Sequence, residues 1–262
     1  MGLGPRVKCA CMQVPNYHRS YRHLSTEPAD IGKGVLFGLL PGVVILLGAS
    51  VILPFHGRWV VALLEWIGIP VTPRISYYGR LLIVVPEVPS FAPAHSVYPA
   101  VVAIAGWIVG LVLLMPLSRL TPVRVIGGVA SLVSGVSGTF FYFAGERFPY
   151  TALDFANVWI RAEFVVWLII PALIAIILGT LPLDPATTLL YSAMTLLYAY
   201  WFSAIRLTLF LAFLHYAGLI WLPCIYFLGG FLLDFLYIVS YYSMAVSRTT
   251  RILRQRREVW RW

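Results

Sequence analysis

Long apolar runs separated by short polar stretches recur along most of the chain. The first, GVLFGLLPGVVILLGASVILPF over residues 34–55, contains no charged residue. Similar runs cover residues 97–117, 125–143 and 164–181. Because a helix needs roughly 20 apolar residues to cross a hydrocarbon core of about 30 Å, each run predicts one membrane-spanning helix.

The last apolar stretch is too long for a single crossing. From residue 185 the chain is apolar almost to residue 246. Gly218 and Pro223 supply the only strong turn signals, which favours two long helices over 187–214 and 222–246, with three shorter ones as the alternative. The pattern therefore predicts an all-α integral membrane protein with six transmembrane helices.

The segment from residue 56 to residue 96 breaks this pattern. Residues 59–69 make only half a span, which favours a short interfacial helix. Six prolines between residues 70 and 99 flank the β-rich sequence RLLIVV at 80–85. Since proline lacks a backbone donor and breaks helices, we expect a partly β-like excursion, with a short hairpin, on the outer side.

Composition and charge place the chain in a bilayer. Hydrophobic residues make up 60% of it and charged residues only 11%, which excludes an ordinary soluble domain. The net charge of +9 gathers in the tails at 1–33 and 247–262 rather than on a face with interleaved aromatics, so nucleic acid is not expected as a partner. The positive-inside rule predicts both tails in the cytoplasm of a plasma membrane, although the acid-free N-terminus also resembles a transit peptide.

One full positive charge stands inside the last apolar stretch. If the last two helices turn near Ile220, Arg206 lies 14 residues before the turn and Asp234 lies 14 residues after it. An unpaired charge in hydrocarbon costs at least about 2.5–3.5 kcal/mol, so opposite charges at one depth should meet. We expect an intramembrane ion pair, either purely structural or part of a site that binds an anion or relays protons.

Two further side chains lie near that pair in the sequence. His215 is a titratable group close to the outer end of the Arg206 helix. Cys224 follows a proline in an apolar setting, where thiols are usually inert. Asp234 is the only carboxylate well inside a predicted span, because Glu163 precedes the fourth span and is typical of an interfacial anchor. This single acid argues against a proton-coupled transporter.

Three weaker features concern ligands and partners. The N-terminal residues could close a tetrahedral zinc site, but their spacing is not a zinc-finger pattern and a disordered or lipidated tail explains them as well. The C-terminal arginines are typical of a positive-inside stop signal or of a patch for anionic lipid headgroups. Small residues at i, i+4 and i+8 predict a close helix-packing face, in this chain or with a partner. The possible zinc ligands are Cys9, Cys11, His18 and His23. The C-terminal arginines are Arg248, Arg251, Arg254 and Arg257. The small residues of the packing face are Gly127, Ser131 and Gly135. No cofactor is predicted.

The layout over residues 63–135 resembles the exosortase and archaeosortase family of multi-pass membrane transpeptidases. An amphipathic segment ends in a β-like outer excursion, then a helix runs inward to the basic turn SRLTPVR and a Gly-rich helix returns. The family's cysteine position falls near FAPAHSV, which contains no thiol, and its arginine position near TFFYF, with Arg147 arriving late. Without a thiolate no acyl-enzyme forms, so the resemblance implies a relative that has lost transpeptidation.

The leading hypothesis from the sequence is therefore a non-catalytic accessory or assembly component of a prokaryotic plasma membrane. Its partners would be the lipid bilayer and either another membrane protein or a second copy of the chain. A cysteine-type membrane transpeptidase or protease is one alternative. A small-solute or proton-coupled transporter is the other.

Overall fold

A computed structural model describes residues 23–24, 28–115, 121–179, 184–255 and 260–261. Within these residues, six helical stretches are long and apolar enough to cross a membrane, and an antiparallel hairpin follows the first of them. The predicted all-α, six-helix membrane architecture with a partly β-like excursion is confirmed. Hydrocarbon offers no partner for backbone polar groups, which explains why each crossing is a helix that satisfies its own hydrogen bonds.

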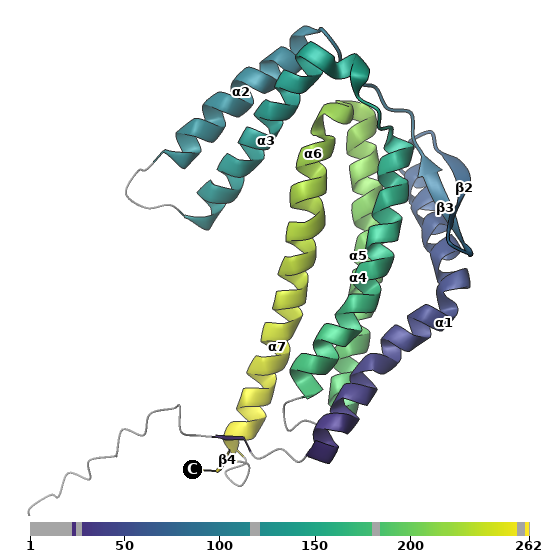
Figure 1. The fold of residues 1–262 in the computed structure, drawn as a ribbon, viewed down its shortest axis with the longest axis vertical. Coiled ribbons are helices and arrows are strands. Elements are labelled where there is room, and N and C mark those ends of the chain that lie inside the picture. The colour runs from purple at the N-terminus through teal and green to yellow at the C-terminus, as the bar shows by residue number, and fades with distance from the viewer. Residues whose placement is uncertain (1–22, 25–27, 116–120, 180–183, 256–259, 262) are drawn as a thin grey trace, which may run out of the picture.

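Helix α1, Pro28–Trp66, is longer than its predicted span of 34–55. It contains Pro41 and Pro54, which remove backbone donors, and its path bends in Figure 1. The predicted interfacial helix at 59–69 is the continuation of α1. Residues 56 and 57, expected in the outer excursion, lie inside α1 and pack against its neighbours. His56 is fully enclosed, and a Cβ on Gly57 would lie only 1.8 Å from the Val84 carbonyl oxygen.

The β-hairpin consists of β2, Thr72–Tyr78, and β3, Leu81–Glu87. Thr72 pairs with Glu87 at its open end and Tyr78 with Leu81 at its turn. Strand β3 is largely buried against α1 and α4, whereas β2 is mostly exposed. Arg74 on β2 forms a 2.5 Å ion pair with Glu87. The part of the molecule that carries this sheet is called the hairpin end below.

Helices α2, Val97–Leu114, and α3, Pro122–Ala144, form a helical arm. The two backbones approach closely at Gly106, which has no Cβ. An added Cβ would stand only 2.4 Å from the backbone nitrogen of Gly135. Trp107 on α2 donates a hydrogen bond to Thr139 on α3. In Figure 1 the arm leans away from the remaining helices and meets them only near the hairpin end.

Helix α4, Ala152–Gly179, begins well before the predicted start at residue 164. Its first turn is closed by a reciprocal cap in which the Asp154 carboxylate accepts from the Thr151 backbone and the Thr151 hydroxyl accepts from the Asp154 backbone. Helix α5, Pro185–Ala217, ends at Gly218, whose φ of 80° suits a residue without a Cβ.

The chain then returns through a short 3-10 turn, Leu219–Trp221, and the one-turn α6, Leu222–Cys224. A π-helical segment, Ile225–Leu232, leads directly into α7, Leu233–Gln255. Two long helices therefore occupy the last apolar stretch, with the break at Gly218.

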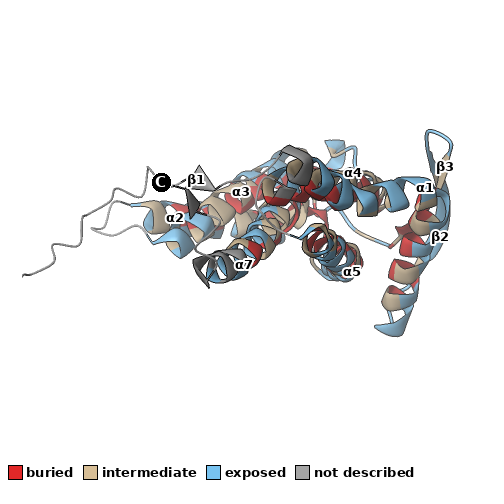
Figure 2. Ribbon diagram, turned by 90° about the horizontal axis from the view of Figure 1, so that it is seen from below, coloured by how far each residue is buried: buried red, intermediate tan, exposed pale blue. Residues whose placement is uncertain are grey.

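The main core lies where α1, α4 and α5 pack together, with β3 covering one side. Trp167, Leu53 and Leu207 are among its fully buried side chains. Figure 2 shows the buried positions along the facing sides of the helices and exposed positions on the outside. Many exposed positions are large and apolar, as expected of a surface that faces lipid tails.

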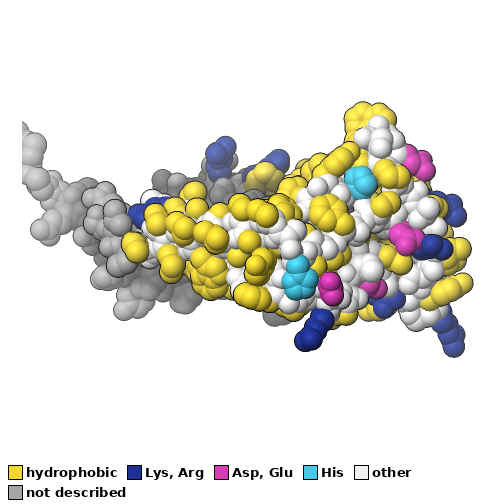
Figure 3. Space-filling view, turned by 90° about the horizontal axis from the view of Figure 1, so that it is seen from above, with side chains coloured by type: hydrophobic (Ala, Val, Ile, Leu, Met, Phe, Trp, Pro, Cys, Tyr) yellow, Lys and Arg dark blue, Asp and Glu magenta, His cyan; other side chains and the backbone are white. Residues whose placement is uncertain are grey.

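The two ends of the described chain lie together, away from the hairpin end (Figure 1). Strand β1, His23–Leu24, pairs with β4, Trp260–Arg261. An even number of crossings requires both ends on one side of the membrane, and this pairing meets that requirement. Viewed from above in Figure 3, acidic and histidine side chains lie towards the centre and right of the molecule, basic side chains appear on both sides, and hydrophobic side chains cover most of the left part.

Candidate functional site: a buried charge cluster

Arg206 lies on α5 with almost no exposure to solvent. Its guanidinium carbon stands 4.8 Å from the centroid of the Trp159 ring and 5.4 Å from that of Phe202. Aromatic faces attract a desolvated cation, so the two rings compensate part of the lost hydration. The charge is therefore held in an enclosed setting that solvent does not screen.

Two carboxylates from different helices reach this guanidinium. Glu163 on α4 forms an ion pair and hydrogen bond with Nη2 of Arg206. Asp234 on α7 stands 2.7 Å from Nη1. Glu163 is 3% exposed and the Asp234 side chain 15%. The three residues are called the charge cluster below.

The charge cluster lies well inside the helices. Glu163 follows the first residue of α4, Ala152, by 11 positions, and Arg206 precedes the last residue of α5, Ala217, by 11. At about 1.5 Å per residue, both lie roughly 16 Å from the ends of their helices nearest the hairpin end. The charges meet because α4 and α5 run antiparallel and side by side.

The π-helical segment positions the third member of the cluster. Asp234 stands in the first turn of α7, immediately after this segment. Nη1 of Arg206 also lies 3.5 Å from the carbonyl oxygen of Gly230 within it. A Cβ on Gly229 would overlap the ring of Phe210, at 2.2 Å, so the segment packs tightly on α5. Such wide turns rotate the residues that follow them and are frequent at functional sites.

A small cavity of about 170 Å³ opens beside the charge cluster. Both carboxylate residues contribute to its wall, together with aromatic and small side chains. Its lining residues are Trp159, Ala162, Glu163, Val166, Tyr226, Gly230 and Asp234. The space is large enough for a few water molecules or one small cation and touches both acids.

A second polar pair, on α5 and α1, lies next to the charge cluster. Ser203, on α5, precedes Arg206 by three residues, so its hydroxyl lies on the same face of the helix as Arg206. The same hydroxyl lies 3.3 Å from Nε2 of His56, which is completely buried. His56 and Ser203 thus place a polar pair on α1 and α5 beside the cluster of Arg206, Glu163 and Asp234.

The charge balance of the cluster is uneven. Arg206 supplies one positive charge, whereas Glu163 and Asp234 supply two negative charges when both are ionised. A buried net charge is costly in a medium of low dielectric constant. The cluster is neutral only when it holds one further positive charge, and a proton is the smallest that meets this need.

Of the site residues predicted from the sequence, two belong to the charge cluster and others lie elsewhere. The structure brings Arg206 and Asp234 together, at the separation given above. His215 and Cys224 are not part of the site, since Nδ1 of His215 is 2.7 Å from the Pro89 carbonyl oxygen and Sγ of Cys224 faces the Ala130 carbonyl at 4.0 Å. No contact between this thiol and this imidazole occurs among the described residues.

The small-residue face of α3 packs against α2 of the same chain. A Cβ on Gly106 would lie 2.7 Å from the Ser131 carbonyl oxygen, and one on Gly135 would lie 2.9 Å from the Trp107 backbone nitrogen. Gly127 borders the same interface, with Leu113 at 3.4 Å from its would-be Cβ. These close approaches explain why the face carries small residues.

The expected zinc ligands Cys9, Cys11 and His18 lie outside the described residues, and His23 lies in strand β1. Within the part of the chain that the structure describes, no three His, Cys, Asp or Glu residues come together as a metal site. Of the C-terminal arginines, Arg248 and Arg251 are exposed on α7.

Sequence reasoning missed Glu163 and His56. The interpretation of Glu163 as an interfacial anchor was wrong, because α4 starts at Ala152 and the side chain turns inward to Arg206. Its neighbour Arg161 does lie towards the hairpin, where it donates to the Tyr77 carbonyl oxygen. A helix cap at Thr151 and Asp154 was the signal for the earlier start. His56 was placed in the excursion because α1 was expected to end at residue 55.

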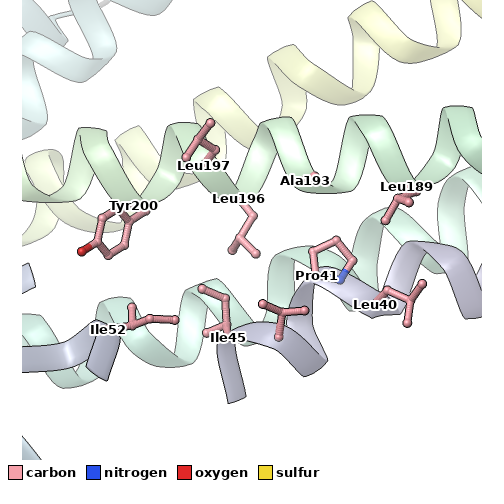
Figure 4. Close-up of a pocket in the computed structure, with 10 residues that line it drawn as sticks. Leu40, Pro41, Ile45, Ile52, Leu189, Ala193, Leu196, Leu197 and Tyr200 are labelled. Atoms are coloured by element: carbon pink, nitrogen blue, oxygen red, sulfur yellow. The ribbon is translucent and has the colours of Figure 1, made fainter. Parts of the chain in front are cut away.

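Two larger pockets have no charged residue in their lining. A groove of about 540 Å³ between α1 and α5 is lined by aliphatic side chains, and Tyr200 supplies its one polar group (Figure 4). Another, of about 580 Å³, lies along α3 and is almost wholly apolar. Both suit hydrocarbon rather than a reacting group.

Comparison with known proteins adds no family to these observations, because no protein-family model, no curated protein and no solved structure matches the chain.

Proposed function

We propose that the protein is a proton-exchanging integral membrane protein of the proton-coupled carrier class, and that the charge cluster is its exchange site. The observation that carries the proposal is the pairing of one buried and one half-buried carboxylate with a single guanidinium, beside a cavity that both acids line. Ionisable groups inside membrane spans are rare and commonly mark ion or proton pathways.

Glu163 changes the argument that the sequence alone supported. Coupled transport was a weak hypothesis while Asp234 was the only acid inside a span. With Glu163 in the same cluster, one acid can remain ionised against Arg206 while the other takes up and releases a proton. The cavity supplies room for the water molecules that would carry the proton.

Proton flux in liposomes tests this proposal. Purified protein is reconstituted with a pH-sensitive dye in the lumen, and the rate of internal acidification is measured after an external acid pulse. Glu163→Gln and Asp234→Asn should each abolish the protein-dependent rate. Glu65→Gln, which alters an exposed acid near the end of α1, should leave it unchanged. Thermal unfolding in detergent verifies that each variant is folded.

Infrared spectroscopy gives an independent readout of the same site. A protonated buried carboxyl has a carbonyl stretching band that an ionised carboxylate lacks. The wild-type protein should show this band, and it should change in Glu163→Gln or Asp234→Asn. Folded variants with wild-type proton flux and an unchanged band would refute the exchange site and leave the cluster as a structural ion pair.

A second candidate function is the accessory or assembly role within a membrane complex, which the layout resemblance to membrane transpeptidases also suggests. It is favoured by the helical arm, whose α2 exposes Ile104, Ile108 and Val112 and which touches the other helices only near the hairpin end. A photo-crosslinking residue at Ile108 should yield one defined membrane-protein adduct or a homodimer. The same residue at Leu47, on the exposed face of α1, is the control, and equal adducts from both positions would contradict the assembly role.

We further propose that the protein lies in a plasma membrane with both ends in the cytoplasm. The paired ends and the exposed Arg248 and Arg251 support this orientation through the positive-inside rule. A cysteine introduced at Thr72, in the exposed strand β2, should react with a membrane-impermeant thiol reagent in intact cells. One introduced at Ser247, beside the basic tail, should react only after the cells are opened. The reverse result would invert the topology.

The same basic end should bind anionic headgroups. Purified protein in detergent should retain phosphatidylglycerol more strongly than phosphatidylcholine, and Arg248→Gln combined with Arg251→Gln should reduce the difference. Equal retention of the two lipids by the unmodified protein would contradict this lipid preference.

A further inference from the structure

The cavity beside the charge cluster has two unlike kinds of wall. One part carries the acidic side chains of Glu163 and Asp234, and the rest is formed by aromatic, aliphatic and glycine residues. Trp159 and Tyr226 are the aromatic members, with ring centroids 6.4 Å apart and ring planes at 83°. The cavity therefore offers negative charge next to a surface that suits hydrocarbon.

One carboxylate oxygen at this cavity lacks a partner. Glu163 is 3% exposed, and its Oε2 makes no hydrogen bond to any described residue. Arg206 contacts the other oxygen, Oε1. A buried acceptor without a donor is costly, so a ligand in the cavity that donates a hydrogen to Oε2 would be stabilised there.

The charge of the cluster sets the charge of that ligand. Arg206 balances only one of the two carboxylates, so neutrality requires one further positive charge. In the proposed exchange site a proton meets this need. A monovalent cation in the cavity meets it equally well, and both acids can then be ionised without a net charge inside the membrane.

Size and wall chemistry select the class of cation. At about 30 Å³ per water molecule, a cavity of about 170 Å³ holds roughly five of them, or an organic molecule with about as many non-hydrogen atoms. Hard metal ions need many oxygen ligands. The Gly230 carbonyl oxygen in this wall already lies 3.5 Å from Nη1 of Arg206. Aromatic and aliphatic walls suit an alkylammonium ion instead, because its nitrogen donates hydrogens and its chain is apolar.

The cavity reaches the surface of the helices at membrane depth. Ala162, on α4, and Tyr226, in the π-helical segment, both line the cavity and are both exposed. Ala162 follows the first residue of α4 by 10 positions, which corresponds to about 15 Å along the helix. An apolar chain favours a ligand that has to reach this depth, because its hydrocarbon leaves water on the way.

We propose that the charge cluster binds a small alkylammonium ion in exchange for its proton. This inference rests on the proposed function and names the substrate class of the same site. The ammonium group lies between Glu163 and Asp234 and donates to Oε2 of Glu163. The alkyl chain packs against Trp159, Val166 and Tyr226. As the ion enters, the protonated carboxyl releases its proton to water, so one positive charge replaces another and no covalent bond of the ligand changes.

Calorimetric titration of the purified protein in detergent tests this assignment. The probe is n-butylammonium chloride, with n-butanol as the neutral molecule of the same chain length and sodium chloride as the metal-ion control. The n-butylammonium ion should bind and release about one proton, which is measured by titration in buffers of different ionisation enthalpy. The inference is overturned if n-butanol binds as tightly, or if Na⁺ releases the proton and n-butylammonium does not.

Substitutions in the cavity wall locate the ligand without changing the acids. Ala162→Trp fills part of the cavity and should weaken n-butylammonium binding by at least about tenfold, whereas Val165→Trp, at an exposed position of α4 outside the lining, should leave it unchanged. Tyr226→Leu should weaken binding by about tenfold and Tyr226→Phe should retain it. Equal affinities across these variants would place the ligand elsewhere and overturn the inference.

The acid variant separates this inference from the proposed function. Glu163→Gln should lose both n-butylammonium binding and proton release. If n-butylammonium does not bind to the wild-type protein while Glu163→Gln abolishes proton flux in liposomes, the inference fails and the proposed function stands. If Glu163→Gln supports wild-type flux, the proposed function fails. Should Glu163→Gln not fold, the comparison of Ala162→Trp with Val165→Trp and of n-butylammonium with n-butanol still decides the inference.

Discussion

Removal of Arg206 should have the largest effect on stability of any substitution in the charge cluster. In Arg206→Met a side chain of similar length remains, but Glu163 and Asp234 lose the guanidinium that faces them both. Breaking a buried ion pair by removal of one partner costs about 3–5 kcal/mol, because the remaining charge is left uncompensated. The contacts of the guanidinium with Trp159 and Phe202 are lost as well, at about 0.5–2 kcal/mol each.

The control is a variant that removes the charges together. Arg206→Met, Glu163→Gln and Asp234→Asn combined leave no ion in the cluster, and replacement of a whole buried ion set by neutral groups is often neutral or stabilising. The free energy of unfolding of this triple variant should therefore return most of the way to the wild-type value. Each variant is compared by denaturant titration in mixed micelles, with the fluorescence of the 9 tryptophans as the signal.

Two results would refute this reasoning. If Arg206→Met unfolds within about 1 kcal/mol of wild type, the three charges do not compensate one another as described. If the triple variant is as unstable as Arg206→Met, the loss comes from packing of the arginine stem rather than from unpaired charge.

Three further predictions concern other parts of the molecule. Gly106→Leu should separate α2 from α3, because a Cβ alone would stand 2.4 Å from the Gly135 nitrogen. The distance between spin labels on the two helices should therefore increase. Gly32→Leu, at a position with open space, should leave that distance unchanged. The hydrogen bond from Arg74 holds the pKa of Glu87 below its ordinary value, so the pair stabilises the β-hairpin at neutral pH and this contribution is lost as the pH falls through the lowered pKa. An NMR titration of the Glu87 carboxyl should show the low midpoint, and Arg74→Leu should raise it; equal midpoints would exclude the interaction. Cys224→Ala should keep full function in cells, because the thiol contacts only a backbone carbonyl among the described residues; loss of function in a folded Cys224→Ala protein would revive the thiol-based alternative.

The helices themselves could be predicted from the sequence because their cause is local. A long run without charges can satisfy its backbone in hydrocarbon only as a helix, whichever neighbours it has. The errors occur at the ends of such runs. They concern residues 152–163 and 56–66, which contain polar side chains and were assigned to loops or to the interface. Both ranges are helical. Glu163 and His56 find partners inside the bundle, and Gly57 packs against β3.

The site was predictable only in its most general feature. Arg206 and Asp234 stand at equal distances from a turn, so simple helix geometry favours their meeting. Glu163 is remote from both in sequence, and its inward direction depends on the rotation of α4 against α5. The same holds for Ser203 and His56, whose contact needs α1 and α5 to be packed side by side.

That this chain is a six-helix membrane protein, and that a charge inside its last apolar stretch needs a partner, follows from the residues alone. Both conclusions follow from the cost of exposing backbone polar groups or a lone charge to hydrocarbon, a cost that depends on residue type and not on the fold. Which groups meet the charge depends on how the helices pack. The rotation and packing of α1, α4, α5 and α7 place two acids around a single arginine, with a serine–histidine pair beside them, and so convert an expected ion pair into a three-residue charge cluster.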